Sequence, residues 1–403
     1  MERREIELFS MKGLRISVDV DGNRVVGARA EGPLSKVASP VMRLIDEFMV
    51  KERPAYIGED FVVPSLFFPP IPSKAFRRAM KTQLVTRLKK KVPEILSVSI
   101  TDYCTANCPM CGHGERAKEP MLTTEEMKKL IDDALALGTY TFLFTGGDPV
   151  LRSDLPELIE YVPNEKAVVI MFTPAQTLYK RAKELKEAGL HSVFVVLHDA
   201  DPDVHNAMMG TEGAFEKAVR SVKACLDEGI LTGIVAILTK ERLSHIHELI
   251  DFASELGVYE LLLSDPLPTG RVLRREDIML TPEEREFVAK LQEEHNSKGE
   301  GVKIFANARV KGCSGVGCVA GSRWLHITST GESQACDYIP LSFGNIRTNK
   351  LSDIWKKITT HPWFAKHTDL CRIQDMEFRK RYFHNIPPNT LLPYPIEKID
   401  SKK

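Results

Sequence analysis

The sequence predicts an α/β protein whose core is a parallel sheet curved as a partial (β/α)6 TIM barrel. Between residues 95 and 271, short apolar runs alternate with amphipathic segments in six successive units. Such repeated strand–helix units form parallel sheets with right-handed crossovers. The expected strands are 95–100, 141–145, 167–172, 192–197, 230–238 and 259–264. The expected helices are 124–137, 154–162, 175–188, 213–228 and 244–256.

Local signals define the ends of these elements. Thr123 or Thr124 followed by Glu126 is a capping start for the first helix of the barrel. A glycine follows each of four helices, where a left-handed cap is favoured: Gly138, Gly189, Gly229 and Gly257. Loops at the carboxyl ends of such strands carry the chemistry of this architecture.

Residues 1–94 are expected to form an α+β extension before the barrel. Alternating apolar residues on both sides of Asp21-Gly22-Asn23 predict a β-hairpin, and residues 37–50 predict a short amphipathic helix. Residues 61–72 are apolar and interrupted by prolines, which excludes a regular helix or a central strand.

The end of this extension, residues 73–92, predicts a basic amphipathic helix. Its apolar residues recur every four positions: Phe76, Met80, Leu84 and Leu88. Lysines and arginines fill most of the remaining surface. Three interpretations are open: a helix docked on the barrel, a helix lying on an anionic membrane surface together with residues 61–72, or a nucleic-acid contact.

Residues 272–300 are charged and predict a helical connector, which leaves residues 301–403 as a C-terminal domain. The chain has 403 residues, and its 55 basic and 55 acidic residues cancel, so no global field directs it to nucleic acid. No long apolar run or signal-peptide core occurs, so a cytoplasmic location is expected. The abundance of Lys, Arg and Glu, with few Asn and Gln, favours a thermophilic source.

The eight cysteines of the chain are mostly clustered, which favours metal binding in a reducing compartment over disulfides. Cys104, Cys108 and Cys111 fall within eight residues, directly after the first expected barrel strand. Three adjacent thiolates repel one another and oxidise easily, so such a cluster normally holds a metal. Zinc, with His113 as the fourth ligand, and an iron–sulfur cluster are both compatible with this spacing.

A second motif decides between the two metals. Residues 142–149, Phe-Leu-Phe-Thr-Gly-Gly-Asp-Pro, predict a strand that ends in a glycine turn. Together with the Cys-x3-Cys-x2-Cys loop, this motif resembles the radical S-adenosylmethionine (SAM) superfamily. Met110 stands where that family usually has an aromatic residue, and Asp148 replaces the commoner Glu.

The resemblance implies a radical SAM enzyme in which the three cysteines bind a 4Fe–4S cluster. The amino and carboxylate groups of SAM then bind the iron that has no protein ligand. Gly146 and Gly147 would allow close approach of the methionine part, and Asp148 would accept a hydrogen bond from its ammonium group. His198, Asp199 and Arg242 stand at further cofactor-contacting positions. Val196 replaces a family Ser, and Arg242 replaces a family Asn.

Four later cysteines extend the resemblance to the branch with a C-terminal SPASM or shortened twitch domain: Cys313, Cys318, Cys336 and Cys371. The dense cysteine run of a full SPASM domain is absent, so one auxiliary 4Fe–4S cluster is expected, with Cys313 as the candidate fourth ligand and zinc as the alternative occupant. Cys225 lies in an expected helix and is interpreted as an ordinary buried thiol.

The expected reaction is reductive cleavage of SAM to a 5′-deoxyadenosyl radical, which abstracts hydrogen from an unactivated C–H bond. A ferredoxin or flavodoxin is the expected electron donor. Because residues 61–92 suggest contact with an anionic membrane or lipid, the leading substrate hypothesis is carbon–carbon bond formation on an archaeal-type isoprenoid lipid. Peptide modification and tetrapyrrole modification are the alternatives, and a non-enzymatic electron-transfer or zinc protein is the remaining one.

Overall fold

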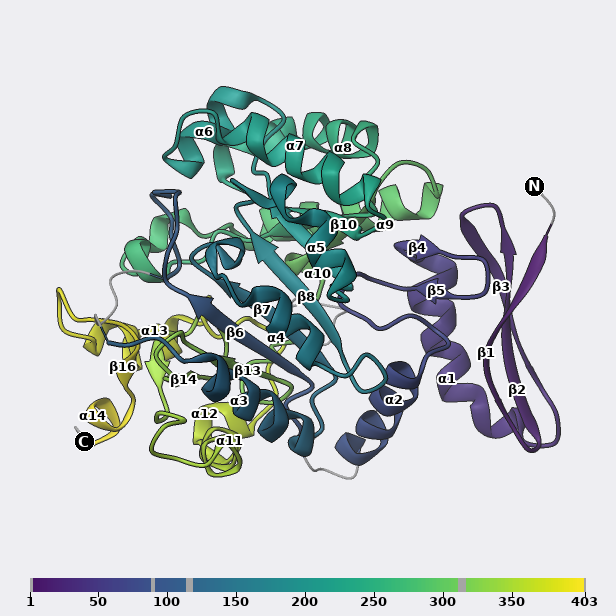
Figure 1. The fold of residues 1–403 in the computed structure, drawn as a ribbon, viewed down its shortest axis with the longest axis horizontal. Coiled ribbons are helices and arrows are strands. Elements are labelled where there is room, and N and C mark those ends of the chain that lie inside the picture. The colour runs from purple at the N-terminus through teal and green to yellow at the C-terminus, as the bar shows by residue number, and fades with distance from the viewer. Residues whose placement is uncertain (1–2, 88–90, 114–118, 311–316, 402–403) are drawn as a thin grey trace.

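The computed structural model describes residues 3–87, 91–113, 119–310 and 317–401. Its centre is a nine-stranded sheet with the order β12-β11-β10-β9-β8-β7-β6-β13-β14 (Figure 1). Six of its strands are β6 (Ile95–Thr101), β7 (Thr141–Gly146), β8 (Val168–Thr173), β9 (Ser192–Val196), β10 (Leu231–Ile237) and β11 (Glu260–Ser264). They pair in parallel and in sequence order, which confirms the predicted barrel strands.

Three further strands come from beyond residue 300. β12 (Lys303–Ala306) pairs in parallel with β11, and β13 (Trp324–Ile327) pairs in parallel with β6 at the opposite edge. β14 (Ser333–Gln334) adds to β13 in the antiparallel direction. The sheet therefore continues on both sides with strands that the sequence did not predict, and its order does not close into a ring.

Helices pack on the outer face of the curved sheet. They are α3 (Thr124–Leu137), α4 (Leu155–Tyr161), α5 (Ala182–Glu187), α6 (Pro202–Met209), α7 (Ala214–Asp227) and α8 (Ile246–Glu255). The predicted capping box at Thr123 and Glu126 is present. The predicted helix 175–188 is wrong in its first half, because Ala175 has φ 56° and only a 3-10 turn precedes α5. Helix α6 was not predicted.

The N-terminal extension begins with a three-stranded antiparallel sheet beside the barrel (Figure 1). Its strands are β1 (Arg4–Met11), β2 (Leu14–Asp21) and β3 (Arg24–Glu31). The β2–β3 hairpin was predicted and β1 was not. One face of this sheet packs on α1 (Ser39–Ile45), which continues as a π-helix over Asp46–Lys51.

The apolar segment 61–72 closes the amino end of the barrel. Val63 and Leu66 are completely buried against inward-facing residues of the sheet, including Phe194. The ring of Phe67 lies 5.1 Å from that of Phe194 and 5.7 Å from that of Phe305. These apolar side chains therefore fill the floor of the barrel, which removes the main reason for expecting a membrane contact here.

Polar contacts fix this segment to the first residues of two strands. The Ser65 hydroxyl and the Leu66 backbone N–H both donate to the Glu260 carboxylate, at 2.8 and 2.9 Å. The Ser192 hydroxyl donates to the Leu66 carbonyl at 2.9 Å. Residues 260 and 192 begin β11 and β9, so the segment lies at the end of the barrel opposite the cysteine loop.

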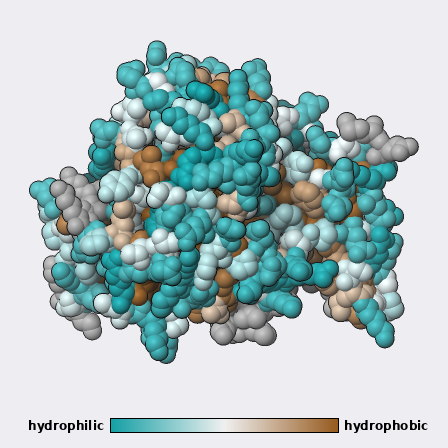
Figure 2. All heavy atoms as spheres, in the orientation of Figure 1, coloured by the Kyte–Doolittle hydropathy of each residue, from teal (hydrophilic) through white to brown (hydrophobic). Residues whose placement is uncertain are grey.

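Helix α2 (Lys74–Arg87) docks on the barrel, as one of the three interpretations expected. Ala75 and Ala79 are 1% and 3% exposed. Arg78 and the Thr82 hydroxyl donate to the carbonyls of Leu135 and Gly138 at the end of α3. The face shown in Figure 2 is largely hydrophilic, with small apolar patches. Among the described residues, no helix has the length and apolar character needed to span a membrane.

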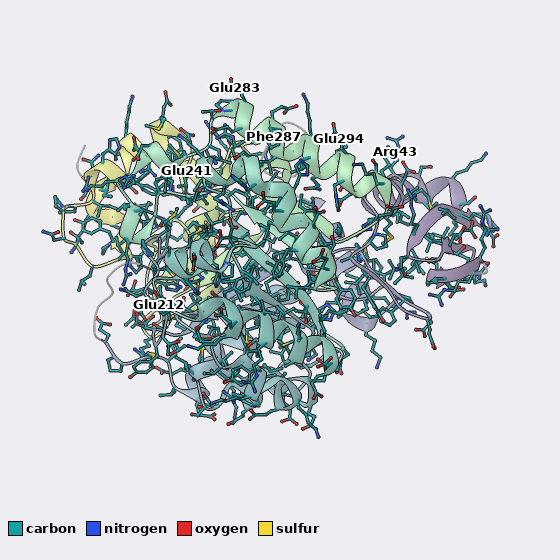
Figure 3. The ribbon with its side chains drawn as sticks, turned by 90° about the horizontal axis from the view of Figure 1, so that it is seen from above. Arg43, Glu212, Glu241, Glu283, Phe287 and Glu294 are labelled. Atoms are coloured by element: carbon teal, nitrogen blue, oxygen red, sulfur yellow. The ribbon has the colours of Figure 1, made fainter. Side chains whose placement is uncertain are left out.

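The connector forms α9 (Pro282–Lys298), which runs along the molecule towards the N-terminal extension; Glu283, Phe287 and Glu294 mark it in Figure 3. The buried Glu52 carboxylate accepts hydrogen bonds from Gln292 and Asn296, both at 2.9 Å. The other C-terminal elements are α10 (Asn307–Val310), β15 (Leu341–Ser342), α11 (Leu351–Thr360), α12 (Pro362–Ala365), α13 (Met376–Arg381), β16 (Tyr394–Pro395) and α14 (Glu397–Asp400).

The packing of the barrel floor predicts opposite outcomes for two neighbouring substitutions. Leu66→Ala removes a completely buried side chain and should lower the free energy of unfolding by about 2–5 kcal/mol. Phe68→Ala is the matched control, because Phe68 is 39% exposed, and should change it by about 0.5 kcal/mol or less. Denaturant unfolding of both variants measures the difference, and equal effects would contradict the assignment of this segment to the floor.

Candidate active site

The cysteine loop, residues 102–113, follows β6 at the carboxyl end of the barrel strands. Cys104 is exposed, while Cys108 and Cys111 are half-buried. Burial, together with the neighbouring Cys111 and Cys104 thiols, raises the pKa of Cys108 to about 11. A metal centre that binds these sulfurs would displace their protons, because the thiolate is the ligand form of cysteine.

The glycine turn after β7 contacts the beginning of the cysteine loop. The Gly147 N–H donates to the Thr101 carbonyl at 2.8 Å, and the Asp148 N–H donates to the Tyr103 carbonyl at 2.6 Å. A Cβ atom on Gly146 would lie 2.2 Å from the Thr101 oxygen, and one on Gly147 would lie 2.1 Å from the Tyr103 oxygen. The glycines are thus required for the approach of β7 to the cysteine loop.

Asp148 has a completely buried carboxylate with one unsatisfied oxygen. Its Oδ1 accepts from the Thr173 hydroxyl at 2.7 Å and from the Val150 N–H at 3.2 Å. Its Oδ2 has no hydrogen-bond partner, and burial raises the pKa of the carboxyl group. The carboxylate also raises the pKa of the Cys104 thiol, after the larger effect of burial. An unsatisfied carboxylate oxygen beside the cysteines fits the ammonium group of SAM.

Two other loops hold the cysteine loop in place. The Asn107 N–H donates to the Met209 carbonyl at 3.0 Å, and a Cβ on Gly210 would lie 2.3 Å from the Asn107 oxygen. From the loop after β11, Arg271 Nη1 donates to Asn107 Oδ1 at 2.7 Å and to the Cys108 carbonyl at 2.8 Å. Arg271 was not among the predicted site residues, because its contact with the cysteine loop depends on the tertiary fold.

The loop after β9 contributes His198 and Asp199. The Ile237 N–H donates to Nδ1 of His198 at 3.2 Å, so the proton of the neutral ring is on Nε2. Burial, with a contribution from His205, lowers the pKa of His198 to about 3, so the ring is a neutral donor at pH 7. Asp199 and Arg242 form a two-bond ion pair at 2.6 and 2.7 Å, which brings these two predicted residues together.

The interior of the barrel changes from apolar at its floor to polar on the β6–β13 side. His326 of β13 is 1% exposed; its Nδ1 lies 2.8 Å from the Ser97 hydroxyl and its Nε2 lies 3.3 Å from the Ser99 hydroxyl. Nearer the mouth, the Asn307 amide donates to the Ser264 hydroxyl at 2.8 Å. The sequence alone did not identify His326, because its strand was not predicted.

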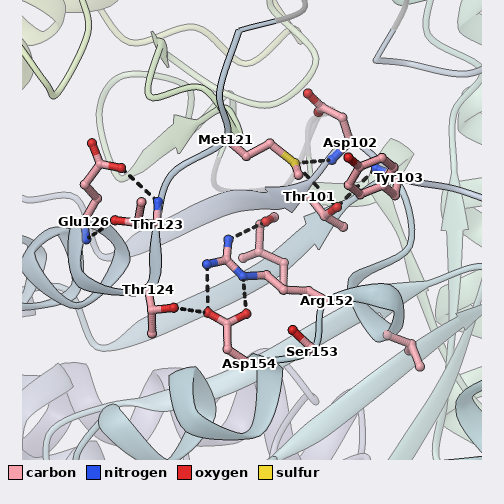
Figure 4. A network of polar contacts seen from close by, with 12 residues as sticks. Thr101, Asp102, Tyr103, Met121, Thr123, Thr124, Glu126, Arg152, Ser153 and Asp154 are labelled. Carbon is pink, nitrogen blue, oxygen red and sulfur yellow. Dashed lines mark hydrogen bonds and ion pairs between the residues drawn. The ribbon is translucent and has the colours of Figure 1, made fainter.

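The chain that follows the cysteine loop is also held in place, at Met121 (Figure 4). The sulfur of Met121 lies 3.4 Å from the Asp102 N–H, so residues on both sides of the loop meet. Arg347 of the C-terminal region donates to the Pro120 and Met121 carbonyls and forms an ion pair with Glu126 at 2.6 Å. This arginine ties the start of α3 to the C-terminal domain.

The structure brings three of the four predicted auxiliary cysteines together. Hydrogen bonding from the Cys371 thiol lowers the pKa of Cys318 to about 7, although burial and the nearby Cys336 oppose this. The backbone explains the grouping: the Cys318 N–H donates to the Thr368 carbonyl at 2.9 Å. Cys313 lies outside the described residues. Cys225 is completely buried in α7, and burial raises its pKa to about 12, as expected of an unreactive thiol.

Two family models match the parts of the chain that contain the two cysteine groups. Residues 98–253 match the radical SAM superfamily. Residues 318–374 match SPASM, described as an iron–sulfur cluster-binding domain. The first match contains the cysteine loop and the glycine turn, and the second contains Cys318, Cys336 and Cys371.

Three relatives illustrate the range of similar proteins. The AdoMet-dependent heme synthase of Nitratidesulfovibrio vulgaris is 27% identical over 66% of this chain and 79% of the relative. The Fe-coproporphyrin III synthase of Methanosarcina barkeri is 28% identical over 74% of this chain and 86% of the relative. The PqqA peptide cyclase of Granulibacter bethesdensis is 25% identical over 65% of this chain and 74% of the relative.

Solved structures share the fold. Streptococcus suis SuiB bound to the precursor peptide SuiA aligns with a TM-score of 0.57 and 16% identity, over 90% of both chains. Native anSMEcpe with bound AdoMet aligns with a TM-score of 0.53 and 18% identity, over 68% of this chain and 82% of the other. At these identities the similarity concerns the fold alone.

The contact between β7 and the cysteine loop predicts that Gly147→Ala disrupts the first site. The added methyl group would collide with the Tyr103 carbonyl, and a displacement of about 1 Å at a reacting centre costs about 100-fold in rate. SAM cleavage by the reconstituted protein measures this loss. Gly112→Ala is the control, because its Cβ would meet only the Thr269 methyl group at 3.6 Å. Equal cleavage by both variants would contradict the argument.

The Glu126–Arg347 ion pair predicts a pH-dependent stability. Hydrogen bonding from Arg347 lowers the pKa of Glu126 to about 2, below its ordinary value of 4.5. The pair therefore stabilises fully above the unfolded-state pKa, and this stabilisation is lost as the pH falls from about 5.5 towards 2. Because both side chains are about one-third exposed, Glu126→Gln should cost only about 1 kcal/mol at pH 7 and progressively less in acid.

Denaturant unfolding at pH 7 and pH 3 tests this dependence. Glu125→Gln is the control, since Glu125 shares the first turn of α3 but its side chain is 82% exposed and does not contact Arg347. A cost for Glu126→Gln that does not change with pH, or one no larger than that of Glu125→Gln, would count against the ion pair.

Two cysteine groups, each within the range matched by a family model, are joined in one fold. The first lies at the mouth of a partial barrel beside a glycine turn and an unsatisfied carboxylate oxygen, which fit a SAM-binding 4Fe–4S cluster. The second gathers sulfurs in the C-terminal region for an auxiliary cluster. The chain is an enzyme of the radical SAM superfamily with a SPASM iron–sulfur cluster-binding domain.

Proposed function

We propose that this enzyme abstracts hydrogen from an unactivated C–H bond of a carboxylate-bearing tetrapyrrole. The observation that carries the proposal is the sequence similarity to enzymes of tetrapyrrole synthesis, which extends over most of this chain and most of each relative. Three heme synthases and an Fe-coproporphyrin III synthase align over 65–74% of this chain and 74–86% of the relatives. These matches extend beyond the barrel; the PqqA peptide cyclase matches to a similar extent, which keeps a peptide as the second candidate substrate.

The lining of the barrel supports a polar substrate. On the β6–β13 side the buried hydroxyls of Ser97 and Ser99 hydrogen-bond the imidazole of His326, and Ser264 and Asn307 pair nearer the mouth. Hydroxyl, imidazole and amide groups can bind the carboxylates of a tetrapyrrole, whereas a saturated isoprenoid chain offers them no hydrogen-bond acceptor. The lipid hypothesis also rested on residues 61–72, whose apolar side chains fill the barrel floor.

In this proposal Cys104, Cys108 and Cys111 would hold the first 4Fe–4S cluster, and SAM bound there would supply, on one-electron reduction, a carbon radical that abstracts hydrogen. The unsatisfied Oδ2 of Asp148 would accept from the amino group of SAM. His198 would donate to the cofactor from Nε2, and the Asp199–Arg242 ion pair would fix the loop after β9 on which His198 lies.

The second site would hold one auxiliary 4Fe–4S cluster on Cys318, Cys336 and Cys371, with Cys313 as the predicted fourth ligand. Four protein ligands would leave no iron open to substrate, so this cluster would accept or relay an electron. A ferredoxin or flavodoxin remains the predicted electron donor.

Peptide modification is the second candidate function, and the structure gives a specific reason to keep it. The alignment with the peptide-bound SuiB structure covers 90% of this chain, so it includes part of residues 1–94 as well as the barrel. The PqqA peptide cyclase is also among the relatives.

Substrate-dependent formation of 5′-deoxyadenosine distinguishes these candidates. The reconstituted enzyme, with reductant and SAM, is incubated separately with iron–coproporphyrin III, with peptide mixtures and with isoprenoid lipid vesicles. Stimulation by the tetrapyrrole alone is the expected result, and Cys108→Ala should abolish the product because the cluster loses a ligand. Stimulation by peptides and not by the tetrapyrrole would overturn the assignment.

A further inference from the structure

The loop after β11, residues 265–277, lies between the two cysteine groups; it is called the β11 loop below. One side of it contacts the cysteine loop. The Arg271 backbone N–H donates to the Cys111 carbonyl at 3.0 Å, and the Arg271 side chain holds Asn107 and the Cys108 carbonyl. Gly270 has φ 54°, and a Cβ on it would lie 2.3 Å from the Cys111 oxygen. The β11 loop and the cysteine loop are therefore in direct backbone contact.

The other side of the β11 loop contacts the auxiliary-cysteine region. The Thr269 hydroxyl donates to the Tyr338 carbonyl at 2.8 Å, two residues after Cys336. The Gln374 amide donates to Asp265 Oδ2 at 3.0 Å, three residues after Cys371. The β11 loop thus touches the chain next to two of the three described auxiliary cysteines.

A completely buried arginine fixes the β11 loop to the C-terminal region. Arg379 is 0% exposed, and its guanidinium donates to the Pro268 carbonyl at 3.1 Å and to the Leu273 carbonyl at 2.6 Å. It also forms an ion pair with Glu276 at 2.7 Å. These contacts hold both ends of the 268–276 stretch, so this part of the loop cannot shift independently of the C-terminal domain.

We propose that Thr269 is a positioning residue that sets the separation of the two iron–sulfur clusters. Thr269 holds the Cys336 segment through its hydroxyl, and Arg271, two residues later, holds Cys111 through its backbone. Two hydrogen bonds and the three consecutive residues 269–271 thus connect the Cys336 segment to Cys111. Thr269 is only 2% exposed. The position of each cluster is therefore coupled to that of the other through the β11 loop.

This inference rests on the proposed function only in requiring that both cysteine groups bind clusters. What it adds is that the Thr269 hydroxyl holds the Cys336 segment at a fixed distance from the cysteine loop. Thr269→Val keeps the shape of the side chain and removes the donor, whereas Thr269→Ser keeps the donor and removes a methyl group. The two variants therefore separate the hydrogen bond from simple packing.

The test uses the full-length, reconstituted chain with both clusters reduced. The dipolar interaction between two paramagnetic clusters falls with the cube of their separation, so electron paramagnetic resonance relaxation reports their relative position. Thr269→Val should retain the iron content of the parent protein but show a changed cluster–cluster interaction. Thr269→Ser should match the parent in both measurements. Loss of auxiliary iron in Thr269→Val would count against the inference, because the hydroxyl would then be needed for cluster binding and not for cluster separation.

Two further outcomes would overturn the inference: an unchanged interaction in Thr269→Val, or equal changes in the valine and serine variants. Failure of the proposed function is seen separately. If the parent protein itself binds iron for only one cluster, or if SAM leaves its spectrum unaltered, the assignment of the sites is wrong and the variants need not be compared.

Discussion

The structure depends on the close approach of two backbone segments, the end of β7 and the beginning of the cysteine loop. The parallel pairing of β6 and β7 continues past the strands into two hydrogen bonds, from Gly147 to Thr101 and from Asp148 to Tyr103. Only residues without a Cβ atom allow this contact. It brings Asp148, which follows the glycines, next to Cys104, so the sheet itself places a carboxylate at the metal site.

Much of the barrel was predictable because its strands are buried on both sides. Fully buried strands read as continuous apolar runs, and their helices carry capping residues and terminal glycines. Strands β12 and β13 escaped prediction because each has only four residues and β13 contains Trp324 and His326. Their partners are distant in sequence, so no local pattern marks them. The mixed character of β13 reflects its position: Trp324 and His326 face the barrel interior and contact Ser97.

The sequence predicts the candidate ligands of the site but not the residues that hold those ligands in position. Spacing identified the cysteines and the glycine pair, since these residues must be adjacent in sequence to act together. The partners that hold them are set by the tertiary fold. Thr173 binds Asp148 from another strand, and Arg271 reaches the cysteine loop from more than 160 residues away. Likewise, the apolar segment at residues 61–72 resembled a membrane contact because its burial depends on the barrel that follows it.

The two edge strands have a consequence for the synthesis of this protein. β12 and β13 lie on opposite sides of the six earlier strands, yet both come from residues 303–327. While the ribosome is still producing the chain, the six earlier strands expose an unpaired edge on each side. Unpaired edges are templates for association with other chains. The completed sheet ends instead in β12 and β14, of four and two residues, and such short edge strands are poor templates. The longer edges of the nascent barrel are therefore exposed to association until residues 303–334 emerge, close in sequence to the auxiliary cysteines.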